Sequence, residues 1–370
     1  MLIGAAVIVG VMVYTYVGYP LLIAVLARLF PMRLKHDPAW EPTVSVCLTV
    51  YNGAAYLDAK IESLLAMDWP RHKLEILIYS DASTDATDAI IARWQTLQPV
   101  VRFIRGPSRE GKPTGLNCLR EMAVGEVLLL TDVRQTLAPN ALRVLVDHLA
   151  DPRVGCVSGN LMLDGEAGSG IYWRYEKFIR RQEARFRSIV GVTGSIFAIR
   201  KRDMPVLPHD LVLDDVWIPM RLRLEGRRIV FADDAEAYDV AAEDDREFSR
   251  KVRTLAGNYQ LFAWMPLLLS PLHNRSWFET FSHKFLRLVC PWMSLLLIGA
   301  AWAAAMGEEA ATARAIGEAL LGAQVIFYFV ALVGPRAGRL GRLARTFVVM
   351  NAAAMLGFGR FLSGRQRVTW

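Results

Sequence analysis

Charged residues lie next to a strongly apolar run in the first half of this chain. The stretch "LLLTDVRQT", residues 128–136, is a run of leucines that ends at Asp132, and Arg134 follows two residues later. Open α/β sheets bind ligands at the carboxyl ends of their strands, so an acid in this position is a candidate ligand-binding residue. A second acid at the place of Arg134 would complete a carboxylate pair for a metal ion bound to a diphosphate. The arginine leaves two interpretations, an active site or the remains of one.

Two further loops carry polar residues directly after apolar runs. Asp81 follows "KLEILIYS", and Lys112 lies in "GKPTG" ahead of a helical pattern. Asp81 suits a hydrogen bond from a ribose or a base, while a lysine beside a helix start favours a phosphate. Each loop alone is also typical of ordinary turns, so the nucleotide-binding hypothesis rests on their joint order. The complete patterns G-x-x-x-x-G-K-[ST] and, after the first predicted strand, G-x-G-x-x-G are absent, which argues against ATPases and dinucleotide-binding enzymes.

The region that carries these loops has the pattern of an α/β domain. Residues 43–260 alternate between short β-branched or leucine-rich runs and longer amphipathic stretches, which is typical of βαβ units around a largely parallel sheet. We predict strands at 43–50, 73–80, 100–106 and in the leucine run before Asp132. Since the carboxyl ends of parallel strands share one edge of the sheet, the polar loops are expected to form one crevice.

The composition indicates that part of the chain contacts lipid. Its 370 residues are 53% hydrophobic, and the mean hydropathy is +0.26. Residues 2–29 are long and apolar enough for a transmembrane helix, and Arg28, Arg33 and Lys35 predict an uncleaved anchor followed by cytoplasmic residues. The net charge of +7 suits an anionic membrane surface, a nucleotide or a nucleic acid. The four cysteines lie far apart and are interpreted as reduced packing residues.

Further apolar blocks follow the α/β region. One begins near Leu286, another spans roughly 316–334, and the arginines behind it predict a cytoplasmic loop. The last block, 346–362, either crosses the membrane or lies re-entrant. The mixed aromatic and basic segment before Leu286 favours helices in the headgroup region, or else a core helix of the α/β domain. The predicted organisation is an anchor at 1–35, a cytoplasmic α/β domain at 40–260, interfacial amphipathic helices at 261–285, and C-terminal transmembrane helices with a basic tail at 286–370.

The order of the motifs over residues 43–260 resembles that of family 2 glycosyltransferases, which are inverting, membrane-associated enzymes with a GT-A fold. Four segments resemble the donor-binding part of that family: "VSVCLTVYNGAAYL", "YSDASTDAT", "GKPTGLN" and "LLLTDVRQT". Ser80 replaces the first of the usual paired acids before Asp81, and Arg134 stands at the second acid of the D-x-D motif. The resemblance implies that the donor is bound by Tyr51, Asp81, Lys112, Asn117 and Asp132, with Asp132 as metal ligand.

Three later segments resemble the acceptor and catalytic parts of the same family: "VGVTGSIFAIRK", "LVLDDVWIPMRL" and "SRKVRTLAGNYQ". The resemblance implies acceptor-binding roles for Trp173, Thr193, Gly194, Ser195 and Asp214, donor-binding roles for Arg250 and Arg253, and Asp215 as general base.

Each of these roles has an alternative. Either acid of the 214–215 pair also suits a helix N-cap, the helix around Trp173 suits a solvated amphipathic helix, and the two arginines suit anionic headgroups. The apolar residues around Asp215 are expected to raise its pKa by desolvation. Thr254 replaces the tryptophan of the family's Q/R-x-x-R-W motif, which weakens the case for a processive enzyme.

The implied function is that of a multi-pass enzyme of the cell membrane with a cytoplasmic catalytic domain. It would be a hexosyltransferase that moves a sugar from a nucleotide diphosphate sugar, a UDP-sugar, to a lipid-linked or polysaccharide acceptor. Mg²⁺ or Mn²⁺ is the expected cofactor, without an organic cofactor, and partners would belong to polysaccharide or glycolipid biosynthesis in the cell envelope. The alternatives are a processive polysaccharide synthase and a catalytically silent, nucleotide-binding membrane scaffold. Binding to nucleic acid is not expected, because the arginines cluster beside the apolar blocks.

Overall fold

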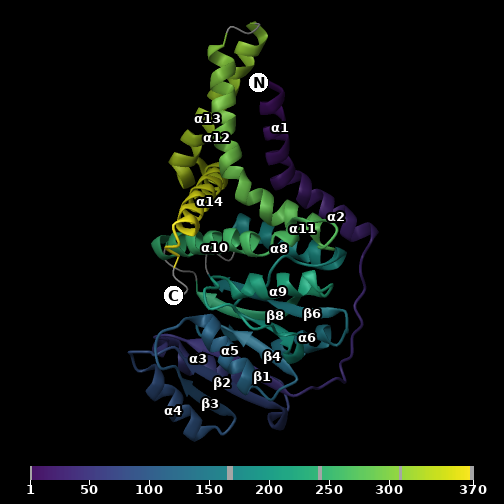
Figure 1. Cartoon of the computed structure of the whole chain (residues 1–370), viewed down its shortest axis with the longest axis vertical. Coiled ribbons are helices and arrows are strands. Elements are labelled where there is room, and N and C mark those ends of the chain that lie inside the picture. Colours follow the sequence, from purple (N-terminus) through teal and green to yellow (C-terminus); the bar gives the residue numbers. More distant parts are fainter. Residues whose placement is uncertain (1, 165–169, 241–243, 308–310, 367–370) are drawn as a thin grey trace.

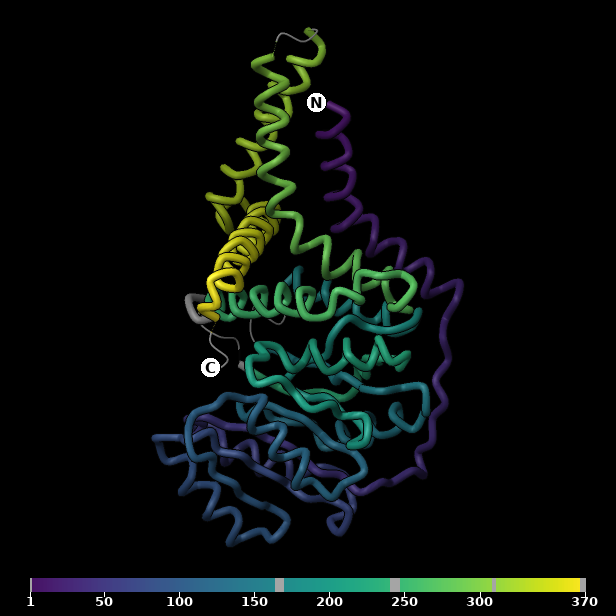
Figure 2. The backbone as a smooth tube through the Cα atoms, in the orientation of Figure 1, coloured from purple at the N-terminus to yellow at the C-terminus, as the bar shows by residue number. Residues whose placement is uncertain are grey.

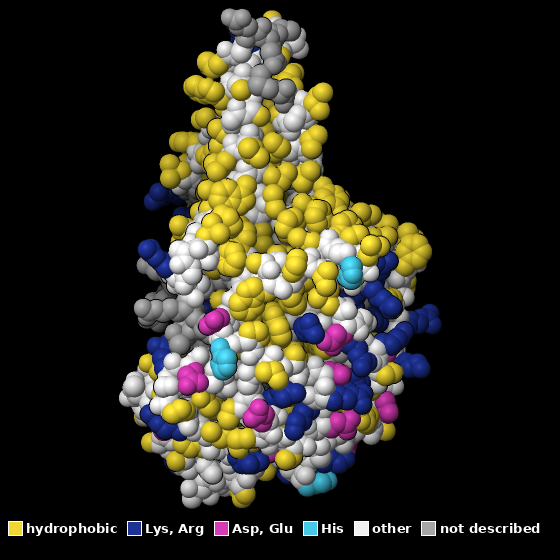
Figure 3. Space-filling model, in the orientation of Figure 1, with side chains coloured by type: hydrophobic (Ala, Val, Ile, Leu, Met, Phe, Trp, Pro, Cys, Tyr) yellow, Lys and Arg dark blue, Asp and Glu magenta, His cyan; other side chains and the backbone are white. Residues whose placement is uncertain are grey.

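The computed structural model describes residues 2–164, 170–240, 244–307 and 311–366. Long helices form one end of the molecule and an α/β domain forms the other, with a layer of helices between them (Figure 1). Hydrophobic side chains cover the helical end, whereas charged side chains are spread over the α/β domain (Figure 3). This separation matches the lipid-contacting and aqueous parts that the composition predicts.

One mixed sheet forms the centre of the α/β domain. In the described part of the chain it has eight strands in the order β3-β2-β1-β4-β7-β6-β8-β5. The first four strands of this order are parallel, and β7 is antiparallel to both of its neighbours. The predicted, mainly parallel sheet is therefore confirmed. The strands are β1 (Val44–Val50), β2 (Leu74–Ser80), β3 (Val101–Arg105), β4 (Val127–Thr131), β5 (Thr136–Leu137), β6 (Val154–Asp164), β7 (Phe197–Arg200) and β8 (Arg228–Val240).

Helices cover both faces of this sheet, which explains its continuous apolar runs. In β4, Leu129 packs into the core on one face, while Leu128 and Leu130 pack into the core on the other. Successive side chains of a strand point to opposite faces, so a strand buried on both sides needs an apolar residue at every position. The covering helices are α3 (Ala54–Leu65), α4 (Thr87–Leu97) and α6 (Ala141–Leu149) for the first core, and α5 (Lys112–Met122) and α9 (Asp214–Leu224) for the second.

Three stretches are long and apolar enough to cross a membrane: Leu2–Leu29, Trp277–Met306 and Ala311–Leu362. The last apolar block, which the sequence left as crossing or re-entrant, belongs to a helix that packs on α10 (Asp244–Trp264). Gly357 makes this close approach possible, because a Cβ there would lie 2.8 Å from the backbone nitrogen of Ala256. The helices are α1 (Leu2–Val13), α2 (Tyr19–Leu29), α12 (Leu286–Met306), α13 (Ala311–Val333) and α14 (Gly338–Leu362).

A layer of helices joins the two ends of the molecule. Met220, Leu261 and Leu288 share one buried cluster, so α9, α10 and α12 pack together. The segment that was expected to contain interfacial helices forms short pieces that pack on this layer, and Pro266 begins one of them. The elements of the layer are α8 (Ile171–Phe186), α10 (Asp244–Trp264), η4 (Pro266–Leu269), α11 (Trp277–Glu279) and η5 (Thr280–Phe285).

An extended linker connects α2 to β1 along the side of the molecule (Figure 2). The backbone of Met32 donates to the carbonyl of Arg185 at 2.8 Å. The backbone of Lys35 donates to the Asp151 carboxylate at 3.1 Å, and Trp40 packs against the core of the sheet. The linker is therefore attached to the α/β domain along its length.

Candidate active site

Three elements bring a lysine and three carboxylates together at the edge of the sheet. Asp132 follows β4, Lys112 begins α5, and Asp214 and Asp215 begin α9. Lys112 Nζ lies 2.9 Å from Asp132 Oδ1 and 3.0 Å from Asp214 Oδ2. Burial disfavours the Lys112 ammonium, but the neighbouring carboxylates outweigh burial and raise the pKa of Lys112. The lysine is therefore a permanent positive charge at this edge.

The loop after α8 brings Gly194 between the acids. A Cβ on Gly194 would lie 3.1 Å from Asp132 Oδ2, 3.6 Å from Asp215 Oδ2 and 3.7 Å from Lys112 Nζ. Because glycine has no Cβ, this volume stays open between two carboxylates and an ammonium group. Asp132 is 42% exposed and Asp214 only 9% exposed, so Asp132 is the acid that a ligand can reach.

Asp215 lies in the first turn of α9 and points into the same site. Burial, followed by the charge of Asp214, raises the pKa of Asp215 to about 6, while Lys112 opposes the rise. The predicted rise of this pKa by desolvation is confirmed. The N-cap position is Leu213, and no side chain caps the helix there, so neither acid of the pair acts as an N-cap. A partly buried carboxylate with a pKa close to neutral is suited to take a proton.

Arg134 lines the same cavity and pairs with an acid of the sheet, Asp239. Its Nε donates to Asp239 Oδ2 at 3.1 Å, and Gln135 Nε2 donates to the same oxygen at 2.7 Å. The Asp239 side chain on β8 is 3% exposed, so the arginine neutralises a buried carboxylate. The residue at the second D-x-D position thus has a structural partner in the sheet.

Some of the predicted donor residues line the cavity, whereas others are hydrogen-bonded to the protein backbone. Tyr51, Lys112 and Asp132 line one cavity. Asp81 instead accepts hydrogen bonds from the backbone nitrogens of Glu110 and Gly111, at 2.8 and 2.9 Å, and so holds the loop before α5. These two contacts place Asp81 in support of the loop that presents Lys112.

Asn117, like Asp81, is hydrogen-bonded to the backbone of another segment. Its amide nitrogen donates to the Leu207 carbonyl at 2.9 Å, and its amide oxygen accepts from the Leu207 nitrogen at 2.8 Å. Both polar atoms of the side chain are used within the protein. The structure therefore places Asn117 in the attachment of α5.

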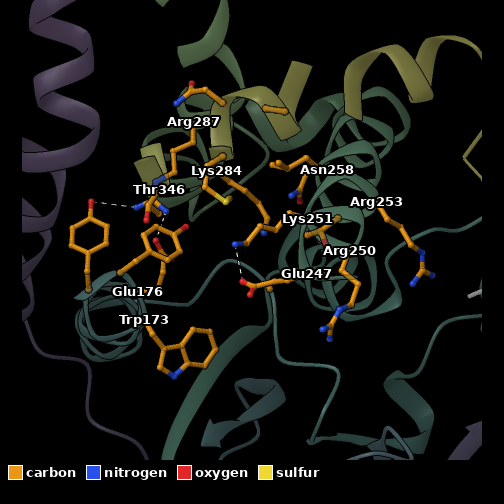
Figure 4. Close-up of a pocket in the computed structure, with 18 of the residues that line it drawn as sticks. Trp173, Glu176, Glu247, Arg250, Lys251, Arg253, Asn258, Lys284, Arg287 and Thr346 are labelled. Atoms are coloured by element: carbon orange, nitrogen blue, oxygen red, sulfur yellow. Dashed lines mark hydrogen bonds and ion pairs between the residues drawn. The ribbon is translucent and has the colours of Figure 1, made fainter. Parts of the chain in front are cut away.

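The predicted acceptor residues and the arginine pair line the cavity of the catalytic acids. Thr193 and Ser195 lie on either side of Gly194, with their hydroxyl oxygens 3.2 Å apart. Trp173 comes from α8, and Arg250 and Arg253 come from α10 (Figure 4). Donor, acceptor and base candidates are therefore brought to one place by elements far apart in the sequence.

The sequence of the domain matches a known family. Residues 45–205 match the family model described as glycosyl transferase family 2. The chain contains a family 2 glycosyltransferase domain. Its β-monoglucosyldiacylglycerol synthase relative from Synechocystis sp. is 22% identical over 70% of this chain and 58% of that protein. Glycosyltransferase AglE of Haloferax volcanii is 24% identical over 60% of this chain and 75% of that protein.

A solved structure supports the GT-A fold of this glycosyltransferase domain, and the match also covers the long apolar helices. The mannosyltransferase PcManGT from Pyrobaculum calidifontis, in complex with GDP-Man and Mn²⁺, superimposes with a TM-score of 0.76. The match covers 97% of this chain and 99% of that one, at 24% sequence identity. The predicted fold class is confirmed.

The glycosyltransferase domain also contains a supporting residue that the sequence did not reveal. Lys60 on α3 is fully buried, and its Nζ donates to the Thr131 hydroxyl at 2.6 Å and to the Gln135 carbonyl at 2.8 Å. Burial lowers the pKa of Lys60 to about 7. These bonds hold both ends of the turn that carries Asp132. On an amphipathic helix such a lysine resembles an ordinary surface residue, so no sequence signal marks it.

The cavity of the glycosyltransferase domain continues between the long apolar helices. Its volume is about 2660 Å³, and its lining extends from Asp132 and Asp215 to Met12 on α1, Phe327 on α13 and Phe347 on α14. Single small-molecule sites usually measure about 300–1,000 Å³. The cavity therefore has room for more than a nucleotide sugar, and its additional part has apolar walls.

The Arg134–Asp239 pair leads to a first prediction. Arg134→Leu is expected to lower the free energy of unfolding by about 3 kcal/mol, because it leaves a buried carboxylate without its cation. Thermal unfolding of the purified protein in detergent measures the effect. The double variant Arg134→Leu, Asp239→Asn should recover part of the loss, since it removes the unpaired charge. An unchanged melting temperature for Arg134→Leu would contradict the structural role of this pair.

Proposed function

We propose that this protein is an inverting glycosyltransferase that moves a sugar from a nucleotide diphosphate sugar to a hydroxyl group of a membrane-associated acceptor. The observation that carries the proposal is the position of Asp215. This partly buried base candidate lies beside Asp132 and Lys112, in a cavity that continues between the long apolar helices. Such a cavity suits a soluble donor at one end and an acceptor that enters from the bilayer at the other.

In the proposed reaction, Asp215 removes the proton of the acceptor hydroxyl as its oxygen attacks the anomeric carbon. Attack from the side opposite the leaving diphosphate inverts the configuration at that carbon. Negative charge grows on the diphosphate as the glycosidic bond breaks, and Lys112 at the edge of the sheet offsets it. Arg250 and Arg253 lie three residues apart on one face of α10 and would contact the same diphosphate.

The acids of the site fit a divalent cation. Asp132 Oδ1 contacts Lys112, while its Oδ2 borders the open volume beside Gly194. Carboxylate oxygens are the ligands that Mg²⁺ and Mn²⁺ prefer, and the bound cation would polarise the phosphate oxygens of the donor. The Mn²⁺ in the mannosyltransferase structure supports this assignment. Asp132 would hold the ion.

The membrane location is proposed from the three long apolar stretches and from the distribution of arginines and lysines beside them. The positive-inside rule then puts the glycosyltransferase domain in the cytoplasm, where nucleotide sugars are made. A relative named for a glycolipid product supports an acceptor in the membrane.

The proposal is tested by incubating the purified full chain with UDP-sugars and GDP-mannose, with membrane lipids as acceptors and with Mg²⁺ or Mn²⁺. Release of UDP or GDP, together with a lipid product heavier by one sugar in mass spectrometry, is the expected result. Nucleotide binding without release from any donor would favour the silent scaffold instead. A ladder of products with many added sugars would favour the processive synthase.

Metal removal gives a second prediction. Treatment with EDTA is expected to lower nucleotide release by at least about tenfold, because the charge on the leaving diphosphate loses its main counter-charge. Added Mn²⁺ or Mg²⁺ should restore the rate, whereas Ca²⁺ serves as a control for a cation that prefers a larger coordination shell. Full activity in EDTA would instead assign the stabilisation of the diphosphate to the basic side chains alone.

A further inference from the structure

Basic residues line the cavity between the loop at 187–196, which carries Gly194, and the long apolar helices. Arg180 comes from α8, Lys284 from η5 and Arg287 from α12, and all three line the cavity that contains Asp215. Lys284 and Arg287 project beside Glu176 in the upper part of this pocket (Figure 4). These residues lie outside the motifs of the glycosyltransferase domain.

Two of these cations lie beside the loop that carries Gly194. A Cβ on Gly191 would lie 3.6 Å from Lys284 Nζ, and Arg180 Nη2 lies 3.5 Å from the Gly191 carbonyl oxygen. Gly194, three residues further on, borders the Asp215 carboxylate. Three residues of extended chain span at most about 11 Å. Lys284 and Arg180 are therefore close enough to the proposed base, Asp215, for one lipid headgroup to contact all three residues.

Two of the acids nearby, Glu176 and Glu183, are already paired with other groups, and a third, Asp215, forms no ion pair with Lys284 or Arg180. Arg287 forms an ion pair with Glu176, while His283 lies 3.2 Å from Glu176 and 2.7 Å from Glu183. Within the described residues, no carboxylate forms an ion pair with Lys284 or Arg180. Arg180 donates instead to the Ser158 hydroxyl at 3.1 Å. Both cations are partly buried and line the cavity, and a partly buried cation without a carboxylate partner favours an anionic ligand.

We propose that Lys284 and Arg180 bind the phosphate of a lipid acceptor whose headgroup carries the reacting hydroxyl. The acceptor class is a polyol or sugar joined to a lipid through a phosphodiester. The apolar walls formed by Met12, Leu297 and Phe327 would contact its hydrocarbon chains, since they belong to the same cavity. This inference rests on the proposed glycosyltransferase function and specifies its acceptor.

The presence of Asp215 as the proposed base explains why the lipid phosphate would only bind, while a headgroup hydroxyl would be the nucleophile. A phosphate oxygen is already ionised near neutral pH, so it needs no base and would be repelled by the carboxylates of the 214–215 pair. In the proposed step the headgroup oxygen bonds to the anomeric carbon and its proton passes to Asp215. The bond from that carbon to the diphosphate oxygen breaks, and the phosphodiester is unchanged.

Lipid binding by the full chain, delipidated in a non-ionic detergent, tests the inference. Native mass spectrometry would compare phosphatidylinositol with monoglucosyldiacylglycerol, a lipid that has sugar hydroxyls but no phosphate. One phosphatidylinositol is expected to bind at least about tenfold more tightly than the neutral glycolipid. Lys284→Met and Arg180→Met should each weaken phosphatidylinositol binding by about tenfold or more, because each removes a charge-assisted hydrogen bond.

Lys251→Met is the matched control. Lys251 lines the same cavity, but its Nζ is paired with Glu247 at 2.7 Å, so its loss should leave phosphatidylinositol binding unchanged. Lys284→Arg keeps the charge and should retain binding even if Lys284→Met unfolds. Equal affinity for the two lipids, or weaker donor binding with unchanged lipid binding in Lys284→Met and Arg180→Met, would overturn the inference. A wild-type chain that binds phosphatidylinositol but releases no nucleotide would refute the transferase function and leave the phosphate site intact.

Discussion

Asp215→Asn is expected to lower kcat by about 10²- to 10⁴-fold, the usual contribution of a general base. Asparagine keeps the shape of the side chain but cannot accept the proton of the acceptor hydroxyl. Asp215 is not among the proposed donor ligands, so the affinity for the nucleotide sugar should change little. Nucleotide release at saturating donor and acceptor measures kcat, and isothermal titration measures donor binding.

Asp214→Asn is the matched control for the base assignment. Asp214 is bound to Lys112 and is only 9% exposed, so its loss should perturb the site without removing the base. A smaller fall in kcat than that of Asp215→Asn is therefore expected. If Asp214→Asn has the larger effect, the base role belongs to Asp214.

Lys112→Met is expected to lower kcat by at least about 10²-fold, since it removes a preorganised charge from the leaving diphosphate. It should also change the pH dependence of the reaction. The Lys112 cation favours the ionised form of Asp215, so its removal raises the pKa of Asp215 above about 6. Activity requires the ionised base and will therefore be lost at a higher pH as the pH falls. The measurement is kcat/KM as a function of pH for both proteins.

Lys112→Arg provides the control for charge. It keeps a cation beside the acids, so the acidic limb of its pH profile should stay near that of the wild type, although the rate falls because the donor geometry differs. An acidic limb that is unchanged in Lys112→Met would contradict the electrostatic link between Lys112 and Asp215. A kcat of Lys112→Met equal to that of the wild type would contradict the role of Lys112 at the diphosphate.

The sequence predicted the central acids and the lysine because each follows or begins a strongly patterned element. Asp132 ends a leucine run, Lys112 begins a helix, and parallel strands bring such ends to one edge. The direction of Arg134 was not predictable in this way. Its partner, Asp239, lies 105 residues further along the chain, and only the pairing of β5 with β8 brings the two together.

The supporting residues depend even more on tertiary packing. Lys60 is buried because the turn after β4 covers it, and Lys284 reaches the catalytic loop because η5 packs on the layer below the membrane helices. Amphipathic patterns assign both lysines to exposed positions. Asn117 was predicted as a donor residue, and its two bonds to Leu207 became visible only with the fold.

The linker between α2 and β1 attaches the α/β domain to the first long apolar helix. Its backbone is bonded to Arg185 and Asp151, and Trp40 packs against the core of the sheet. In the proposed membrane enzyme, these contacts would restrict how far the α/β domain can move away from the bilayer. They would therefore favour acceptors whose reacting hydroxyl lies close to the headgroup region.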